Sequence, residues 1–312
     1  MKLFKKIAAA LLMLCLIAGL IPMAYAENPE TDEDFYIGKS WDDVVVSLFQ
    51  KYDVDPDTVA LGYYNTVTGE EHFHNADKYM VAGSMYKVPL NMLFAEKIGK
   101  GEMGWDDDVR GYKYSELLRG SIVHSDNDYA EALWREAGTW LDNGNSLYHR
   151  YRELICPYMG EDAATVDPKF YENNFMTARQ MTECIKTLVA EPERFPKIME
   201  TMQEAEPENY FKLKEQRFNI GHKYGFLLDG QRLAMCDCGF AFTDDPIVMV
   251  MFTDGTNKAY DVMADYAVMM CDYTQYNTAL RLENEKLEQA KAEAEAKAQA
   301  EAERGKPKRP PK

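Results

Sequence analysis

The sequence predicts an α+β fold in which both ends of one globular unit build a single antiparallel sheet, with helices from the middle of the chain packed beside it. Apolar and polar residues alternate at 59–64 and 71–74, as in paired strands. Helical periodicity dominates residues 88–202, and strand-like runs return between residues 223 and 252. Helices beside an antiparallel sheet bury the apolar faces of both kinds of element, so we expect a sheet with flanking helices and a helical subdomain.

The N-terminus predicts export. Lys2, Lys5 and Lys6 precede an apolar run at 7–21, and Ala24-Tyr25-Ala26 is a small-x-small cleavage site. We therefore interpret residues 1–26 as a signal peptide and residues 27–39 as a polar linker. No later run of about 20 apolar residues follows, so we expect no membrane span after cleavage and a secreted or extracytoplasmic protein.

The first strand pair, turned at Thr68-Gly69, leads into Ser84-Met85-Tyr86-Lys87, which opens the next helical run. Ser84 and Lys87 are three apart, so on a helix they share a face and the amine can reach the hydroxyl. Serine is a weak nucleophile that needs an adjacent base, and Ser–Lys pairs supply one. A helix N-terminus would also point N–H groups at a developing oxyanion. The alternative is an ordinary amphipathic helix that begins with an incidental Ser and Lys.

A second motif, Ser125-Asp126-Asn127, lies between two predicted helices, at 114–123 and 129–134. A loop there can face a cleft, with Ser125 relaying a proton to a leaving group and Asn127 donating to a substrate amide. Asp126 or Asn127 as a helix cap is the alternative, and it is compatible with the functional interpretation.

The third motif, Lys223-Tyr224-Gly225, opens two predicted strands turned at Asp229-Gly230, and residues 247–252 form another. An edge strand carrying Lys223 could flank Ser84. Gly225 would let a substrate backbone approach closely because it has no side chain.

Taken in this order, the three motifs resemble those of the class A β-lactamase and penicillin-binding-protein (serine D,D-peptidase) superfamily, over residues 40–273. The resemblance implies that Ser84 is the acylated nucleophile, Lys87 its proton partner, and Ser125 with Lys223 the relay on the far side. It also implies residues that bind the substrate or the oxyanion: Asn127, Tyr224, Gly225, the backbone N–H groups of Ser84 and Phe226, and Arg232 for a substrate carboxylate.

The chain departs from the family pattern in three places. Tyr224 stands where the family usually has Thr or Ser, and the 41-residue step from Ser84 to Ser125 is shorter than usual, which implies a lost segment beside the cleft. Glu161 lies 36 residues after Ser125, close to the usual interval for the Glu that activates the deacylating water. The expected Glu-x-x-Leu-Asn pattern is missing, so a surface Glu is the alternative.

Our first functional hypothesis is an exported serine hydrolase that opens β-lactams through a Ser84 acyl-enzyme. The alternatives are a D,D-peptidase-like penicillin-binding protein acting on D-Ala-D-Ala-like wall peptides, and a non-catalytic wall-binding module on the same fold. We expect no cofactor and no metal, since His72-x-His74 alone is a weak pattern. A net charge of −17 argues against nucleic acid as a partner.

The remaining segments suggest structural roles. Cys236 and Cys238 are predicted as small buried hydrophobes on one strand, and the five cysteines of the mature chain show no disulfide framework. Residues 274–304 are a charged Ala/Glu/Lys segment that should form a solvated helix. Residues 305–312 are basic, Pro-rich and predicted to be disordered, either as a solubilising tail or as a contact for anionic cell-wall polymers.

Overall fold

A computed structural model describes residues 33–304, with the exception of residues 173, 207, 208 and 231. The predicted signal peptide, most of the predicted linker and the 305–312 tail lie outside the described residues. The chain divides into two compact units, residues 1–35 and 36–312. Everything below concerns the second unit.

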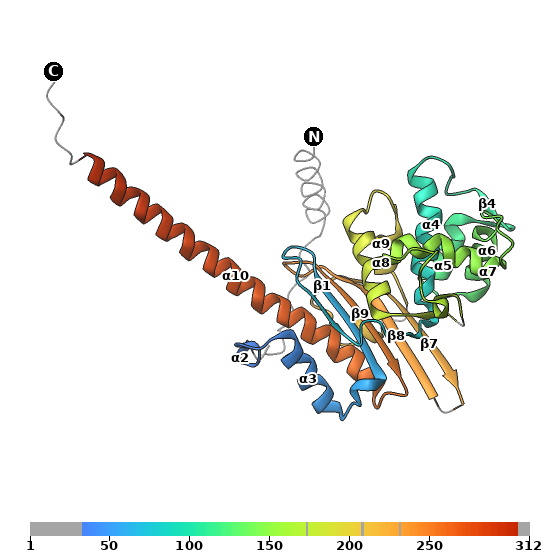
Figure 1. Cartoon of the computed structure of the whole chain (residues 1–312), viewed down its shortest axis with the longest axis horizontal. Helices are drawn as coiled ribbons and strands as arrows, with labels where there is room; N and C mark the ends of the chain where they lie inside the picture. Colours follow the sequence, from blue (N-terminus) through green and yellow to red (C-terminus); the bar gives the residue numbers. More distant parts are fainter. Residues whose placement is uncertain (1–32, 173, 207–208, 231, 305–312) are drawn as a thin grey trace, which may run out of the picture. The chain divides into compact units, whose positions relative to one another are not determined.

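The centre of the molecule is a five-stranded antiparallel sheet with the strand order β2-β1-β9-β8-β7 (Figure 1). Its strands are β1 (Val59–Asn65), β2 (Glu71–His74), β7 (Ile220–Asp229), β8 (Arg232–Ala241) and β9 (Ile247–Asp254). The early strand β1 pairs with the late strand β9 along seven residues, and β7 forms one edge. The predicted sheet built from both ends of the unit is therefore confirmed.

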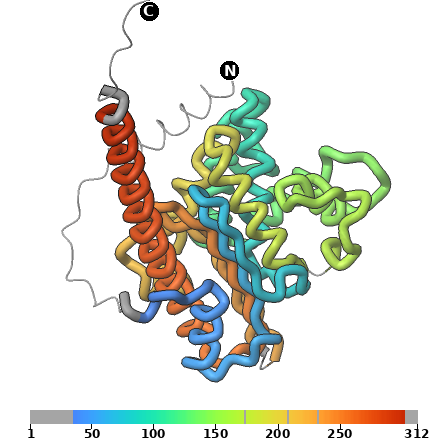
Figure 2. Tube along the Cα trace, turned by 60° about the vertical axis from the view of Figure 1, so that its left-hand side comes forward, coloured from blue at the N-terminus to red at the C-terminus, as the bar shows by residue number. Residues whose placement is uncertain are grey.

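Helices cover both faces of the sheet (Figures 1 and 2). One face carries α3 (Trp41–Tyr52) and the first part of α10 (Ala259–Arg304), which also pack on each other. The other carries α8 (Ala178–Ala190), which contacts β1, β8 and β9. Beside α8 lies the helical subdomain, formed by α4 (Lys87–Gly99), α5 (Tyr114–Ile122), α6 (Asn127–Ala137), α7 (Leu147–Ile155) and α9 (Ile198–Gln203). The α+β class with a helical subdomain is thus confirmed.

Short elements connect these parts. They are α2 (Glu33–Tyr36), η1 (Pro56–Thr58), β3 (Met80–Val81), η2 (Gly83–Tyr86), β4 (Asp108–Val109), β5 (Tyr112–Lys113), η3 (Cys156–Met159), η4 (Pro168–Tyr171), β6 (Phe175–Met176) and η5 (Tyr210–Lys212). The two-residue strands β3 and β6 pair with each other, which ties the chain just before Ser84 to the chain just before α8.

The core explains why the sheet holds α8 so closely. Residues 247–252 of β9 are all buried, because this central strand is covered on both faces. A Cβ on Gly62 of β1 would lie 2.1 Å from Thr182 Oγ1 of α8, so only glycine permits this approach. Burial of each large apolar side chain contributes about 1.5–3 kcal/mol. The five cysteines of the described region are buried and unpaired, and Cys236 and Cys238 are the small buried hydrophobes that were predicted.

Helix α10 runs without a break from the domain into the charged segment. Residues up to Thr278 include many buried side chains, whereas residues 283–301 are all exposed. The predicted boundary at residues 273 and 274 falls inside this helix. Among the described residues, no helix is both long and apolar enough to cross a membrane.

Candidate active site

Ser84 lies in the single 3₁₀ turn η2, and Lys87 is the first residue of α4. The serine was expected on the helix itself, but the helix begins three residues later. The 3₁₀ geometry still aligns the pair, because side chains at i and i+3 eclipse one another in a 3₁₀ turn. The turn is closed by a hydrogen bond from Met85 N to Ala82 O of 2.9 Å.

Strand β7 packs directly against this turn. A Cβ on Gly225 would lie 2.3 Å from Ser84 N, and a Cβ on Gly83 would lie 2.7 Å from Phe226 N. Both glycines are therefore required by the close approach of two backbones. The approach places the N–H groups of Ser84 and Phe226 on adjoining segments, as a pair of oxyanion donors requires.

The Lys87 amine is held between two carbonyl oxygens. Its Nζ lies 2.6 Å from Ser125 O, 2.8 Å from Asn127 Oδ1 and 3.4 Å from Ser125 Oγ. Burial lowers the pKa of Lys87 to about 8, against a smaller opposing effect of Asp126. A neutral Lys87 amine can donate its two hydrogens to these two carbonyl oxygens. Its lone pair then remains available to act as a base.

The Lys223 amine approaches Ser125 from the other side. Its Nζ donates to Ser125 Oγ and to Tyr224 O, both at 2.9 Å, and lies 4.0 Å from the centroid of the Tyr224 ring. Burial, followed by repulsion from Lys87, lowers the pKa of Lys223 to about 7, while Asp237 opposes the shift. Two fully buried lysines thus converge on one hydroxyl.

The loop before α6 presents that hydroxyl in a constrained backbone conformation. Ser125 has a φ of +57°, which is unfavourable for a residue with a side chain and is typical of functional sites. The next residue, Asp126, caps α6 by accepting from Tyr129 N at 3.0 Å. The predicted helix cap and the predicted site loop are therefore both present.

Tyr224 is buried at the edge of the sheet and reaches the same hydroxyl. Its phenol is hydrogen-bonded to the Ser125 side chain, and burial raises its pKa. Its ring stacks on Tyr210 with centroids 4.7 Å apart. The phenol thus contacts Ser125, a contact that the predicted role of Tyr224 in substrate binding did not include.

Two other predicted residues are less closely connected to this cluster. Glu161 is half-buried and its Oε1 accepts from Gln180 Nε2 at 2.9 Å; the same nitrogen lies 3.1 Å from Tyr79 Oη. Among the described residues, no hydrogen bond or ion pair joins Lys87 to Glu161. Arg232 starts β8 opposite Asp229, and its side chain lies outside the described part of the structure.

Sequence reasoning missed a buried hydrogen-bonded pair on β7 and β8. His222 Nδ1 and Asp237 Oδ2 are 2.8 Å apart, and both side chains are fully buried. The only signal was a charged residue between Cys236 and Cys238 in an otherwise apolar strand. Alternation along that strand does not reveal its partner.

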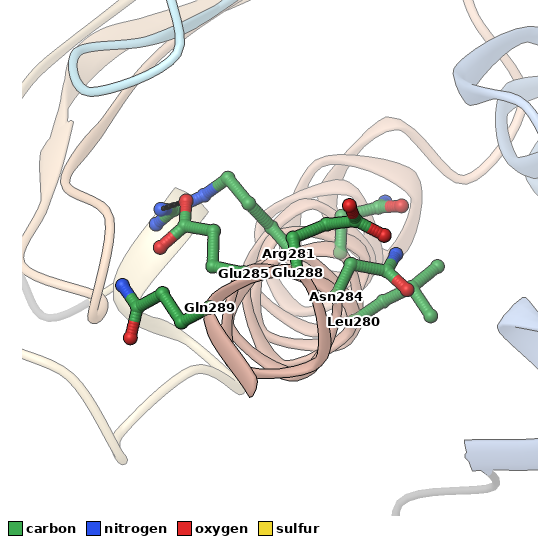
Figure 3. A pocket seen from close by; sticks show the side chains of 7 residues that line it. Leu280, Arg281, Asn284, Glu285, Glu288 and Gln289 are labelled. Carbon is green, nitrogen blue, oxygen red and sulfur yellow. Dashed lines mark hydrogen bonds and ion pairs between the residues drawn. The ribbon is translucent and has the colours of Figure 1, made fainter. Parts of the chain in front are cut away.

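A hollow elsewhere on the molecule is unrelated to these residues. It is lined by Asn277, Leu280, Arg281, Asn284, Glu285, Glu288 and Gln289, all on α10 (Figure 3). No metal-binding cluster of His, Cys, Asp or Glu occurs among the described residues.

A model of the β-lactamase enzyme family matches residues 43–272. The chain belongs to this family. The predicted resemblance is confirmed, and membership supports a β-lactamase-like hydrolase. No curated protein sequence matches the chain.

Solved β-lactamases share the fold at low sequence identity. The TLA-3 extended-spectrum β-lactamase is 14% identical with a TM-score of 0.60, covering 76% of this chain and 100% of that one. A β-lactamase from Chitinophaga pinensis is 17% identical, TM-score 0.57, covering 74% and 97%. One from Xanthomonas campestris is 12% identical, TM-score 0.54, covering 78% and 96%.

Proposed function

We propose that the chain is an exported serine hydrolase of the class A β-lactamase type, which opens β-lactams through an ester on Ser84. The observation that carries this proposal is the convergence of Lys87 and Lys223 on Ser125 Oγ, with Ser84 in the turn that leads into Lys87. Export rests on the signal-like residues 1–26. Contact of the basic 305–312 tail with wall polymers is part of the same proposal.

In the first step, neutral Lys87 takes the Ser84 proton while Ser84 Oγ attacks the lactam carbonyl carbon. The negative charge moves to the carbonyl oxygen, where the N–H groups of Ser84 and Phe226 receive it. The C–N bond of the ring then breaks, and the nitrogen takes a proton from Ser125, which charged Lys223 polarises. Ser125 regains a proton from Lys87, which thereby passes on the one it took from Ser84 and becomes neutral again. The product is an ester of Ser84 with the opened ring.

The substrate is held by groups around this centre. Asn127 offers its amide to a substrate amide, and Gly225 leaves the β7 backbone open to pairing. The positive charge of Lys223, with Arg232, suits the carboxylate that β-lactams and D-Ala-D-Ala peptides both carry.

Release requires water to attack the ester, and here a second candidate gains support. The family resemblance assigns this step to Glu161, but the described hydrogen bond of Glu161 is to Gln180, so we do not assign it the role of base. A site without a base at the ester releases its product slowly, which is the behaviour of a D,D-peptidase-like penicillin-binding protein toward lactams. The lifetime of the ester distinguishes the two.

A non-catalytic wall-binding module is the less favourable alternative. Burying two ammonium groups against a single hydroxyl costs free energy, since desolvation disfavours the charged forms. Binding alone gives no chemical reason for that cost.

The test is intact-protein mass spectrometry of residues 27–312 over time after addition of a penicillin, beside Ser84→Ala. A Ser84-dependent adduct that decays within seconds to minutes supports a lactamase, and one that persists for hours supports the peptidase. Absence of any adduct in the unmodified chain would overturn the acyl-enzyme proposal.

A further inference from the structure

Asn174 contacts the turn that carries Ser84 at two points, and no step above uses it. It lies just before β6, which pairs with β3 on the N-terminal side of that turn. Ala82 N donates to Asn174 O at 3.0 Å, which extends this pairing by one residue. The Asn174 side chain reaches the next residue, where its Nδ2 donates to Gly83 O. Asn174 therefore holds the two residues that come directly before the proposed nucleophile.

The conformation of Asn174 suits both contacts. Its φ is +58°, a left-handed conformation that asparagine adopts more readily than most residues with a side chain. Its amide nitrogen faces Gly83 O, because the opposite orientation would bring two acceptor oxygens together. Asn174 Oδ1 is buried and has no hydrogen-bond partner among the described residues. Within that part of the chain, the bond to Gly83 O is therefore what fixes the orientation of this side chain.

The bond to Gly83 O also fixes the N–H group of Ser84. The two groups belong to one planar trans peptide, in which the C=O and the N–H point in opposite directions. A donor that holds the carbonyl therefore sets the direction of the amide hydrogen. A carbonyl oxygen has two lone pairs, so Gly83 O can accept from Asn174 without giving up a hydrogen bond within the 3₁₀ turn. Ser84 N–H is one of the two proposed oxyanion donors, so its direction matters for the reaction.

The turn needs such support because its own geometry constrains this peptide weakly. Gly83 has a φ of +49°, and glycine has a wide choice of backbone conformations. A 3₁₀ turn also has poorer hydrogen-bond geometry than an α-helix. Strand β7 limits the space, since a Cβ on Gly83 would lie 2.7 Å from Phe226 N. Steric packing thus excludes a side chain at Gly83, whereas a directional hydrogen bond sets the rotation of the peptide.

We propose that Asn174 is a positioning residue, which turns the Gly83–Ser84 peptide so that Ser84 N–H points at the substrate carbonyl oxygen, beside Phe226 N–H. Asn174 acts through Gly83 and not on a reacting atom. The orientation of the peptide stands on the contacts described above. Its effect on acylation rests on the proposed function.

Two variants remove the side-chain bond and keep the backbone of residue 174 in place. Glycine adopts a left-handed conformation at no steric cost, so Asn174→Gly keeps the backbone bond from Ala82 and loses the bond to Gly83 O. Asn174→Asp keeps the shape of the side chain but offers a carboxylate, which cannot donate. The second variant gives an answer if the first does not fold.

Asn75→Gly is the matched control. Asn75 also has a positive φ, of +50°, and its Nδ2 donates to Pro56 O and Val59 O at 2.9 and 2.7 Å. It follows β2, which forms the opposite edge of the sheet from β7. This variant therefore loses the same kind of hydrogen bond far from Ser84. Equal effects in Asn75→Gly and Asn174→Gly would contradict the proposal.

The first measurement needs no catalysis. In weakly aligned protein labelled with ¹⁵N-serine, the residual dipolar coupling of each N–H reports its orientation in the domain, and Ser84→Ala identifies the Ser84 signal. We expect the Ser84 coupling to shrink in both Asn174 variants, because the released peptide samples several orientations, and to stay unchanged in Asn75→Gly. The couplings of Ser47 and Ser121 should stay in place throughout. An unchanged Ser84 coupling in both Asn174 variants would overturn the proposal.

The second measurement is the acylation rate as a function of penicillin concentration. The oxyanion forms only when Ser84 Oγ attacks, so Asn174 affects the transition state and not the bound substrate. We expect the rate at saturation to fall roughly tenfold or more in both Asn174 variants, since loss of a complete oxyanion donor costs about 10²–10³-fold. The half-saturating concentration should change less than about twofold. An unchanged saturating rate, or a loss of affinity alone, would contradict the proposal.

The two measurements separate this proposal from the proposed function. If the unmodified chain forms no ester, the proposed function fails, and the couplings alone decide the orientation of the peptide. If the ester forms and the Ser84 coupling does not respond to Asn174, the proposed function stands and the positioning role fails.

Discussion

Two groups of cations, one on each face of the sheet, have opposite kinds of partner. On the face covered by α3 and α10, cations have carboxylate partners: Lys51 and Lys214 share Asp265, and Arg217 contacts Asp272 at 2.6 Å and Glu215. The hydrogen bond that Lys51 donates to Asp265 raises the pKa of Lys51. On the face toward α4, Lys87 and Lys223 contact hydroxyl and carbonyl oxygens, and burial lowers the pKa of each.

The difference shows that Lys87 and Lys223 lower the stability of the fold while acquiring pKa values suited to proton transfer. A paired cation stays protonated and holds elements together. A buried amine without a direct carboxylate partner exchanges its proton near neutral pH, as a catalytic base must. The pairs with Asp265, Asp272 and Glu215 lie on the face covered by α3 and α10, whereas Lys87 and Lys223 lie on the face toward α4.

The largest effect should follow from removing the hydroxyl of Ser84, the proposed nucleophile. Ser84→Ala leaves no nucleophile, so we expect no penicillin adduct in a period that fully labels the unmodified protein. The lost hydroxyl is small and half-buried, so the change in unfolding free energy should stay within about 0.5 kcal/mol. Mass spectrometry and thermal unfolding measure the two quantities. Retained labelling would show that another residue is the nucleophile.

The comparison between the faces is tested next by Lys87→Met and Lys214→Met. Loss of the base in Lys87→Met should slow acylation by roughly 10²–10⁴-fold. Its stability should be unchanged or higher, because methionine buries no charge. Lys214→Met should leave acylation unchanged and lower stability by about 1 kcal/mol or less through loss of its ion pair. Equal losses of stability in both variants would contradict the idea that Lys214 stabilises the fold and Lys87 does not.

The pH dependence of the unfolding free energy tests whether burial perturbs the pKa of Lys87. Burial lowers the pKa of Lys87 from 10.5 to about 8 in the folded protein, so between about pH 8 and pH 10.5 the unfolded chain binds more protons. Stability contributed through this group therefore rises with pH, by up to about 1.4 kcal/mol per pH unit. Denaturant unfolding should show a smaller rise for Lys87→Met. Parallel curves for the two proteins would mean that Lys87 is not perturbed.

A smaller effect is expected from Glu161→Gln. Glutamine keeps an oxygen that can accept from Gln180, so the loop should remain in place. Because the described hydrogen bond of Glu161 is to Gln180, we expect the ester to decay within twofold of the unmodified rate, as followed by mass spectrometry. Accumulation of the ester would instead assign the deacylating role to Glu161.

The smallest effect should come from deleting residues 289–312. Residues 289–301 are exposed, and the acids that serve the paired face, Asp265 and Asp272, lie earlier in α10. We expect the unfolding free energy to change by less than about 0.5 kcal/mol. A larger loss would show that the charged segment supports the domain.

The strands of the sheet and the three motifs could be predicted from the sequence because both depend on local residue patterns. Alternation located the strands, and turn residues located the hairpins at Thr68-Gly69 and Asp229-Gly230. The pairing of Asp237 with His222 could not be read in this way, because it depends on the register of two strands. The α-helix start at Lys87 rather than Ser84 was missed because 3₁₀ and α turns share the same local preferences. The hydrogen bond between Glu161 and Gln180 depends on tertiary packing.

Because α10 is continuous, the length and direction of its exposed C-terminal part are both fixed. From residue 279 to Arg304 the helix rises about 1.5 Å per residue, or nearly 40 Å in all. An Ala/Glu/Lys helix of this kind behaves as a semi-rigid spacer, whereas a flexible chain of the same length would fold back over its own domain. The end of the described helix at Arg304 is thereby held at a distance from the sheet.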